Sequence, residues 1–235
     1  MQIKGFIEVS FSDWDGKVSS VIFLPSCNMR CPFCYNTKLV LHPDKMPTHD
    51  LTNVENYLQK NRKWIDGVVI TGGEPTIHMD LPVLCKKIKE LGFPVKLDTN
   101  GTNPTLMVEL LNEGLIDYVA MDVKAPLTLE KYSKASGVNA SLFLPKIKKT
   151  IDTLLSRKVE YEFRTTTVPS IHGVKDIEEI CQKIKGCEKY ALQNFRANAE
   201  TLDPTFQSLK PFSKVDLENF QKIAQNFIPK VIIRG

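Results

Sequence analysis

The sequence lacks a long apolar run. None of its 235 residues lies in a stretch that approaches the length of a membrane-spanning helix. Residues 1–5 also lack the apolar core of a signal peptide. We therefore expect a cytoplasmic protein without a membrane partner.

The sequence also has little net charge. Its 31 Lys and Arg residues and 27 Asp and Glu residues give a formal charge of +4, and the excess is spread along the chain. Nucleic-acid-binding proteins gather basic residues in a patch, so we expect no nucleic acid partner. No repeat or linker interrupts the sequence, and residues 1–235 are expected to form a single domain.

Strand and helix patterns alternate along the chain. Strands are predicted at 18–24, 67–71, 95–98, 118–123, 160–168, 190–195 and 230–233. Helices are predicted at 51–60, 81–91, 106–113, 144–155, 177–184 and 215–227. This alternation favours an α/β fold, either an incomplete barrel or a doubly wound sheet. In both, the functional groups follow the carboxyl ends of the strands, where most polar motifs of this chain fall.

Three of the six cysteines lie within eight residues, at Cys27, Cys31 and Cys34. A C-x3-C-x2-C spacing lets three thiolates on one loop bind three corners of a cubane iron–sulfur cluster. Such clusters normally take four cysteines, so one iron would keep an open position here. A zinc site is the alternative, because His42 and His49 follow on a loop.

The other cysteines, Cys85, Cys181 and Cys187, are scattered, and we interpret all three as structural.

The cysteine loop, with Phe33 before its last cysteine and Tyr35-Asn36 after it, resembles that of the radical S-adenosylmethionine (SAM) superfamily. The resemblance implies a 4Fe–4S cluster whose open iron binds the amino and carboxylate groups of SAM. An electron from the cluster would cleave SAM into methionine and a 5′-deoxyadenosyl radical. It also implies a partial (β/α)6 barrel, similar to a TIM barrel, and a cofactor-binding role for Phe33.

The motif Thr71-Gly72-Gly73-Glu74 follows the next predicted strand. Read alone it is a tight turn, with glycines where the backbone approaches a neighbour closely. Beside the cysteine loop it resembles the GGE motif of the family. That resemblance implies that Gly72, Gly73 and Glu74 bind the amino group of the methionine moiety.

Two further strand ends resemble those of the glycyl radical enzyme activating enzymes. They are Asp98-Thr99-Asn100-Gly101 and Asp122-Val123-Lys124. The resemblance implies that Asp98, Thr99, Asp122 and Lys124 lie near the methionine carboxylate, where a monovalent cation can bind. Carboxylates beside a bound carboxylate need such a cation or a lysine. Alternatively, the two aspartates only cap turns.

Arg164 lies in a strand that is otherwise suited to burial, so it needs a carboxylate partner. The candidate partners are Asp122, Glu162 and the cofactor. In the family an arginine at this position faces the site, and Val168 would border the adenine. For His172, after the next turn, the alternatives are a position that faces the site and one at the surface, and we expect the surface.

Segments 192–196, 201–204 and 231–235 are similar to the activating proteins of anaerobic ribonucleoside-triphosphate reductase. This implies an enzyme that installs a glycyl radical on that reductase, with flavodoxin or ferredoxin as reductant. It implies no catalytic side chain beyond the cluster and cofactor ligands. The alternatives are a radical SAM enzyme that modifies another peptide or a small molecule, and a zinc-binding interaction module.

Overall fold

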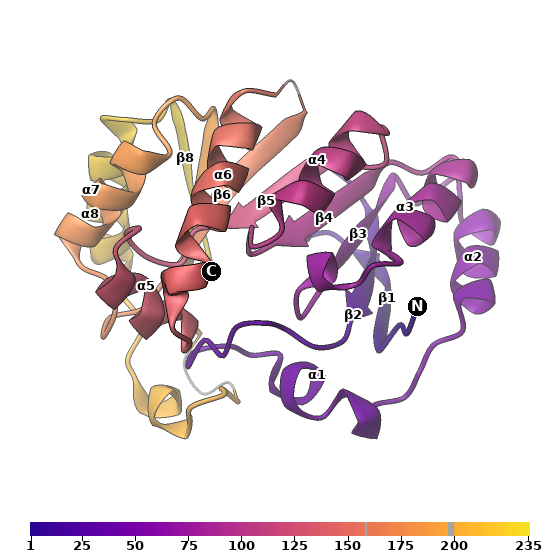
Figure 1. Ribbon diagram of the computed structural model, residues 1–235, viewed down its shortest axis with the longest axis horizontal. Coiled ribbons are helices and arrows are strands. Elements are labelled where there is room, and N and C mark those ends of the chain that lie inside the picture. The colour runs from indigo at the N-terminus through magenta and orange to yellow at the C-terminus, as the bar shows by residue number, and fades with distance from the viewer. Residues whose placement is uncertain (158, 197–199) are drawn as a thin grey trace. The chain divides into compact units, whose positions relative to one another are not determined.

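The computed structural model describes residues 1–157, 159–196 and 200–235 (Figure 1). Within these ranges the strands are β1 (Gly5–Ser10), β2 (Ser19–Leu24), β3 (Gly67–Gly72), β4 (Val95–Thr99), β5 (Tyr118–Asp122), β6 (Glu160–Thr167), β7 (Lys189–Asn194) and β8 (Lys230–Arg234). The α-helices are α1 (Thr37–Leu41), α2 (Leu51–Lys60), α3 (Leu81–Glu90), α4 (Pro104–Asn112), α5 (Leu129–Ser136), α6 (Leu144–Leu155), α7 (Val174–Lys183) and α8 (Lys214–Gln225). Short 3-10 helices lie at Pro43–Lys45, Pro75–Ile77, Ala140–Leu142 and Pro204–Ser208.

The strands follow one another in the sheet in the order of the chain, β1 to β8. Each strand from β2 to β7 is followed by at least one helix before the next strand begins. Strands joined through a helix in this way run parallel, as the pairs β2–β3, β3–β4, β6–β7 and β7–β8 do. The predicted α/β fold class, with six βα units, is confirmed.

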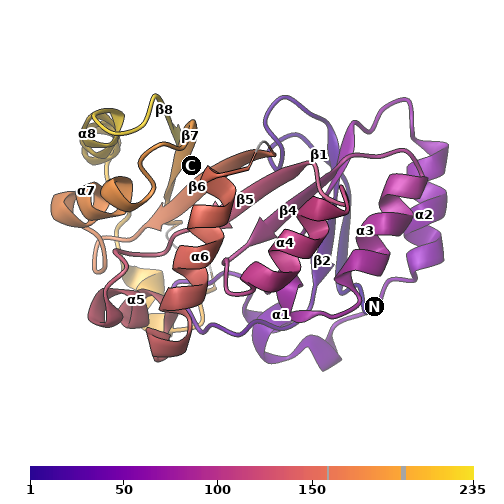
Figure 2. The same cartoon turned by 45° about the horizontal axis from the view of Figure 1, so that its top comes forward.

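The chain divides into two compact units. The first contains Met1–Asn28, Asn36–Thr99 and Thr105–Val119. Here β1 runs antiparallel to β2, whereas β2, β3 and β4 are parallel. The first four residues of β3 are all buried, as expected for a strand covered on both faces. Figure 2 shows α2 and α3 side by side next to these strands.

The second unit contains Met29–Tyr35, Asn100–Pro104 and Ala120–Gly235. Its strands β6, β7 and β8 are parallel, and α7 and α8 pack against each other. Helix α8 begins with a capping box, in which Ser213 and Asp216 each accept the other's backbone N–H. In the described part of the chain, no helix combines the length and apolar character needed to cross a membrane.

A buried ion cluster joins the three strands of the second unit. Glu162 in β6 is 1% exposed, and both of its carboxylate oxygens accept hydrogen bonds from Arg234 in β8, at 2.7 and 2.8 Å. Lys189 in β7 approaches it to 2.9 Å. Burial alone would raise the pKa of Glu162, but the hydrogen bonds and charges of Arg234 and Lys189 outweigh it and lower that pKa to about 2.

This cluster predicts a loss of stability in acid. Because the pKa of Glu162 is lower in the folded state, its contribution is complete above its unfolded pKa of 4.5 and is lost as pH falls toward about 2. We expect the free energy of unfolding to drop by about 2 kcal/mol through this group between about pH 5 and about pH 3. Urea titrations of wild type and Glu162→Gln at the two pH values measure the difference. An equally steep acid loss in Glu162→Gln would contradict the prediction.

Candidate functional site

In the first unit, two glycines bring the end of β3 against the end of β2. Gly72 has a φ of 122°, and a side chain there would overlap the backbone of Leu24. A side chain on Gly73 would overlap the carbonyl oxygen of Ser26. The backbones of Gly73 and Glu74 instead donate hydrogen bonds to the carbonyls of Leu24 and Ser26, both at 2.9 Å. The Gly-Gly pair therefore fixes the backbone that leads directly into Cys27.

Glu74 is buried beneath this turn. It is 1% exposed, and its Oε1 accepts hydrogen bonds from the backbone N–H of Thr76 at 3.0 Å and from the hydroxyl of Thr99 at 2.7 Å. These donors hold one carboxylate oxygen in place. The structure thus links two predicted site residues, Glu74 and Thr99, which lie at the ends of neighbouring parallel strands.

Lys96 compensates the charge of Asp98. It lies two residues before Asp98 on β4, and its Nζ is 2.9 Å from Asp98 Oδ1, with the lysine side chain 3% exposed. The same Nζ donates to the backbone carbonyl of Asp13. Removing either partner would leave the other side chain without this ion pair, so the two side chains depend on each other. Lys96 had no predicted role, although a lysine between Val95 and Leu97 on a buried strand indicates that a carboxylate or carbonyl partner lies close by.

In the second unit, Asp122 at the end of β5 is bound by two cations. Arg164 Nε donates to Asp122 Oδ1 at 2.9 Å, and Lys124 Nζ lies 3.2 Å from Oδ2. Burial alone would raise the pKa of Asp122, but Arg164 and Lys124 together hold it below its usual range. Of the partners considered for Arg164, Asp122 is therefore confirmed. The three groups carry a net positive charge, which suits an anionic ligand.

His172 joins the two loops that carry Lys124 and Val168. Its Nδ1 accepts the backbone N–H of Val168 at 3.0 Å, and its Nε2 lies 2.8 Å from the carbonyl oxygen of Lys124. An amide N–H only donates and a carbonyl only accepts, so the ring is neutral with its proton on Nε2. His172 is 4% exposed, and the expectation of a surface position was wrong. The turn after Pro169 folds inward because two buried backbone groups need this partner.

The cysteine loop is divided between the units, with Cys27 in the first and Cys31 and Cys34 in the second. Cys31 is buried, whereas Cys27 and Cys34 are partly exposed, and none of the three forms a disulfide. Cys34 donates its backbone N–H to the carbonyl of Cys31 at 3.0 Å, which forms a turn between them. Phe33 is 5% exposed and Val168 is fully buried.

The donor chemistry fits an iron–sulfur cluster. Cysteine thiols at this spacing supply the soft ligands that such clusters take. Among residues 1–157, 159–196 and 200–235, no group of three or more Cys, His, Asp or Glu side chains is arranged so that it could hold a metal ion. The iron–sulfur cluster is therefore inferred only from the spacing of the cysteines and the chemistry of their thiols. The ligand roles of the three cysteines stay predictions.

The scattered cysteines are buried, as expected. Cys85 and Cys181 are 0% exposed and Cys187 is 1% exposed. Burial raises the pKa of each of these thiols to about 12, which keeps them protonated and unreactive.

The parallel sheet and the polar groups at its strand ends define a barrel-type α/β enzyme core. A family model described as the radical SAM superfamily matches residues 21–184. This match covers more than half of the sequence, and the chain belongs to the radical SAM superfamily.

A similar curated protein is "Putative glycyl-radical enzyme activating enzyme MJ1227" of Methanocaldococcus jannaschii. It is 38% identical over 234 residues, which cover 99% of this chain and 95% of that protein.

Two solved structures of Streptococcus suis SuiB have a similar fold. SuiB bound to precursor peptide SuiA has a TM-score of 0.68 and 16% identity, over 90% of this chain and 48% of that one. SuiB bound to S-adenosylmethionine has a TM-score of 0.66 and 17% identity, over 92% and 52%. This chain thus spans about half of the SuiB chain. At these identities the likeness concerns the fold alone.

The contacts of His172 predict a cost for its removal. In His172→Ala the buried N–H of Val168 and the carbonyl of Lys124 lose their partner, and we expect a loss of about 1–3 kcal/mol in unfolding free energy. His42 is exposed, so His42→Ala is the matched control and should leave stability unchanged. Urea unfolding near neutral pH measures both variants. Equal stability of the two variants would refute the bridging role.

Burial lowers the pKa of His172, and this effect outweighs the charge of nearby Asp176. A folded pKa below the unfolded value of 6.5 means that the stabilising contribution is present above 6.5 and is lost as pH falls through the folded pKa. The same urea unfolding experiment, repeated below pH 6.5 but above the acid range in which Glu162 titrates, should therefore show a loss in wild type that is absent from His172→Ala.

Proposed function

We propose that this chain binds a 4Fe–4S cluster and SAM and installs a glycyl radical on a partner enzyme. The observation that carries the proposal is the similarity, over 99% of the chain, to a protein named as a glycyl-radical enzyme activating enzyme. Membership of the radical SAM superfamily supports the cofactors, and residues 1–235 would act as a single radical SAM domain. The first candidate partner is anaerobic ribonucleoside-triphosphate reductase, because segments 192–196 and 201–204 resemble its activating proteins.

Cys27, Cys31 and Cys34 are the proposed cluster ligands, and the lack of a nearby fourth cysteine leaves one iron for SAM. When bound, the cluster would supply the one electron needed to cleave a C–S bond of SAM, so that SAM would leave as methionine and 5′-deoxyadenosine and the glycine that loses a hydrogen atom would keep the radical. Flavodoxin or ferredoxin is the proposed source of that electron.

The charges of the chain suit the two ends of the methionine moiety. In the second unit, Lys124 and Arg164 outnumber Asp122, so this group would attract the carboxylate. In the first unit, Glu74 carries the negative charge that would attract the amino group. Gly72 and Gly73 keep side chains away from the backbone beside it.

Asp98 and Thr99 are proposed to support this part of the site. Thr99 does so through its hydrogen bond to Glu74. Asp98 and Asp122 already have protein cations as partners. These side chains compensate the carboxylate charges for which a monovalent metal cation was expected. The binding of such a metal cation stays a prediction. Phe33 and Val168 are proposed as apolar neighbours of the cofactor; both are buried.

The ligand assignment is tested by replacing one cysteine at a time. We expect Cys31→Ala to lose the cluster and to release at least about a hundredfold less 5′-deoxyadenosine from SAM, because one iron loses its thiolate. Cys85→Ala, which removes a buried thiol outside the loop, should retain both. Anaerobic reconstitution, iron and sulfide analysis and chromatography measure these outcomes. Undiminished cleavage by Cys31→Ala, or stoichiometric zinc in anaerobically purified wild type, would contradict the proposal.

The partner is tested by mixing the reconstituted protein with anaerobic ribonucleoside-triphosphate reductase, SAM and a reductant. We expect an electron paramagnetic resonance (EPR) doublet from a glycyl radical on the reductase, and no doublet with Cys31→Ala. SAM cleavage without a doublet would show that the hydrogen atom comes from another peptide or small molecule. That outcome would retain the SAM chemistry and reject the partner.

A further inference from the structure

The turn that ends helix α5 lies against the cysteine loop. Gly137 follows the last residue of α5 with a φ of 67°, in the left-handed region. The carbonyl of Ser136 accepts the backbone N–H of Arg30 at 2.8 Å. A side chain on Gly137 would overlap the carbonyl oxygen of Arg30. Arg30 immediately precedes Cys31, so this contact acts on the backbone beside a proposed cluster ligand.

A second segment holds the same stretch of the loop. The backbone N–H of Asp203 donates to the carbonyl of Pro32 at 2.9 Å, and that of Leu202 donates to the carbonyl of Cys34 at 3.2 Å. Residues 29–35 contain no helix or strand. Their conformation therefore depends on hydrogen bonds from other segments.

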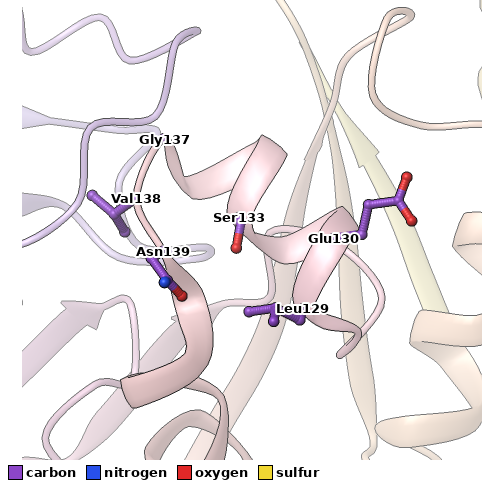
Figure 3. A pocket seen from close by; sticks show the side chains of 6 residues that line it. All are labelled: Leu129, Glu130, Ser133, Gly137, Val138 and Asn139. Atoms are coloured by element: carbon purple, nitrogen blue, oxygen red, sulfur yellow. The ribbon is translucent and has the colours of Figure 1, made fainter.

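Figure 3 shows Gly137 at the end of α5, with Val138 and Asn139 continuing from it. These three residues line one side of a hollow of about 460 Å³, with Leu129, Glu130 and Ser133 on the other side. Gly137 is itself exposed. The crowding at Gly137 comes from the Arg30 backbone, which is a close approach that only glycine permits.

We propose that the Ser136–Gly137 turn is a positioning element for the cluster loop: it sets the backbone of Arg30 and thereby the direction of the Cys31 thiol. The proposal rests on the proposed function, since it assigns a role toward the cluster. Two constraints act at Gly137, the left-handed backbone and the lack of space. The first is common at helix ends and says nothing of a cluster. The second is specific to this loop.

A second glycine, Gly114, makes it possible to test the two constraints at Gly137 separately. It follows helix α4 with a φ of 63°, and nothing lies within 4 Å of a side chain placed there. Gly114→Ala therefore costs only the free energy of placing alanine in the left-handed region. Gly137→Ala has the same cost and also displaces the backbone of Arg30. Asn tolerates the left-handed region better than Ala, so Gly137→Asn reduces the backbone cost and keeps the overlap.

The test is anaerobic reconstitution of the full chain with iron and sulfide, followed by metal analysis and EPR of the reduced protein with and without SAM. We expect Gly114→Ala to match wild type. Gly137→Ala and Gly137→Asn should retain at least about twofold less cluster iron, or give a signal whose response to SAM is altered. Clusters in both Gly137 variants that match wild type in amount and spectrum would overturn the proposal. Failure of wild type itself to take up a cluster would instead reject the proposed function.

Hydrogen exchange tests the same contact without any variant. In cluster-free wild type the amide of Arg30 should exchange at least about tenfold more slowly than an exposed loop amide, because Ser136 accepts its hydrogen bond. Rapid exchange of that amide would overturn the proposal even if Gly137→Ala failed to fold.

Discussion

A loop that carries three cysteines but forms no helix or strand has to be held by the backbone of its neighbours. In the first unit, Gly73 and Glu74 donate hydrogen bonds to Leu24 and Ser26, just before Cys27. In the second unit, Ser136 and Asp203 bind the backbone at Arg30 and Pro32. Close contact of this kind requires glycine at Gly73 and Gly137. The proposed chemistry depends on these contacts, because a ligand loop with several conformations would hold a cluster weakly.

Charge balance is the second feature of the strand ends. Each predicted site aspartate has a cationic partner in its own unit, Lys96 for Asp98 and Arg164 for Asp122. For Asp122, the two neighbouring cations lower the pKa, so its carboxylate stays ionised. Within each unit, a carboxylate and its cationic partner therefore lie together at or near the carboxyl end of a strand.

Periodicity predicted much of the secondary structure because apolar runs of fixed period have few alternatives. The helices at 51–60 and 144–155 were predicted at the bounds observed for α2 and α6. Strand β1 was not predicted, since three of its six residues are exposed and it lacks the apolar signal of a buried strand. Helix α5 was also not predicted; it has only eight residues, and several are polar.

Local patterns, in which each residue is compared with its neighbours along the chain, were enough to predict the order of strands and helices and the residues at the strand ends. The folded chain was needed to show that Lys96 compensates Asp98, that His172 is buried between two loops, and that Gly137 lies against Arg30. Such contacts join residues distant in sequence or depend on burial, and a residue's type does not specify the partner that packing brings to it.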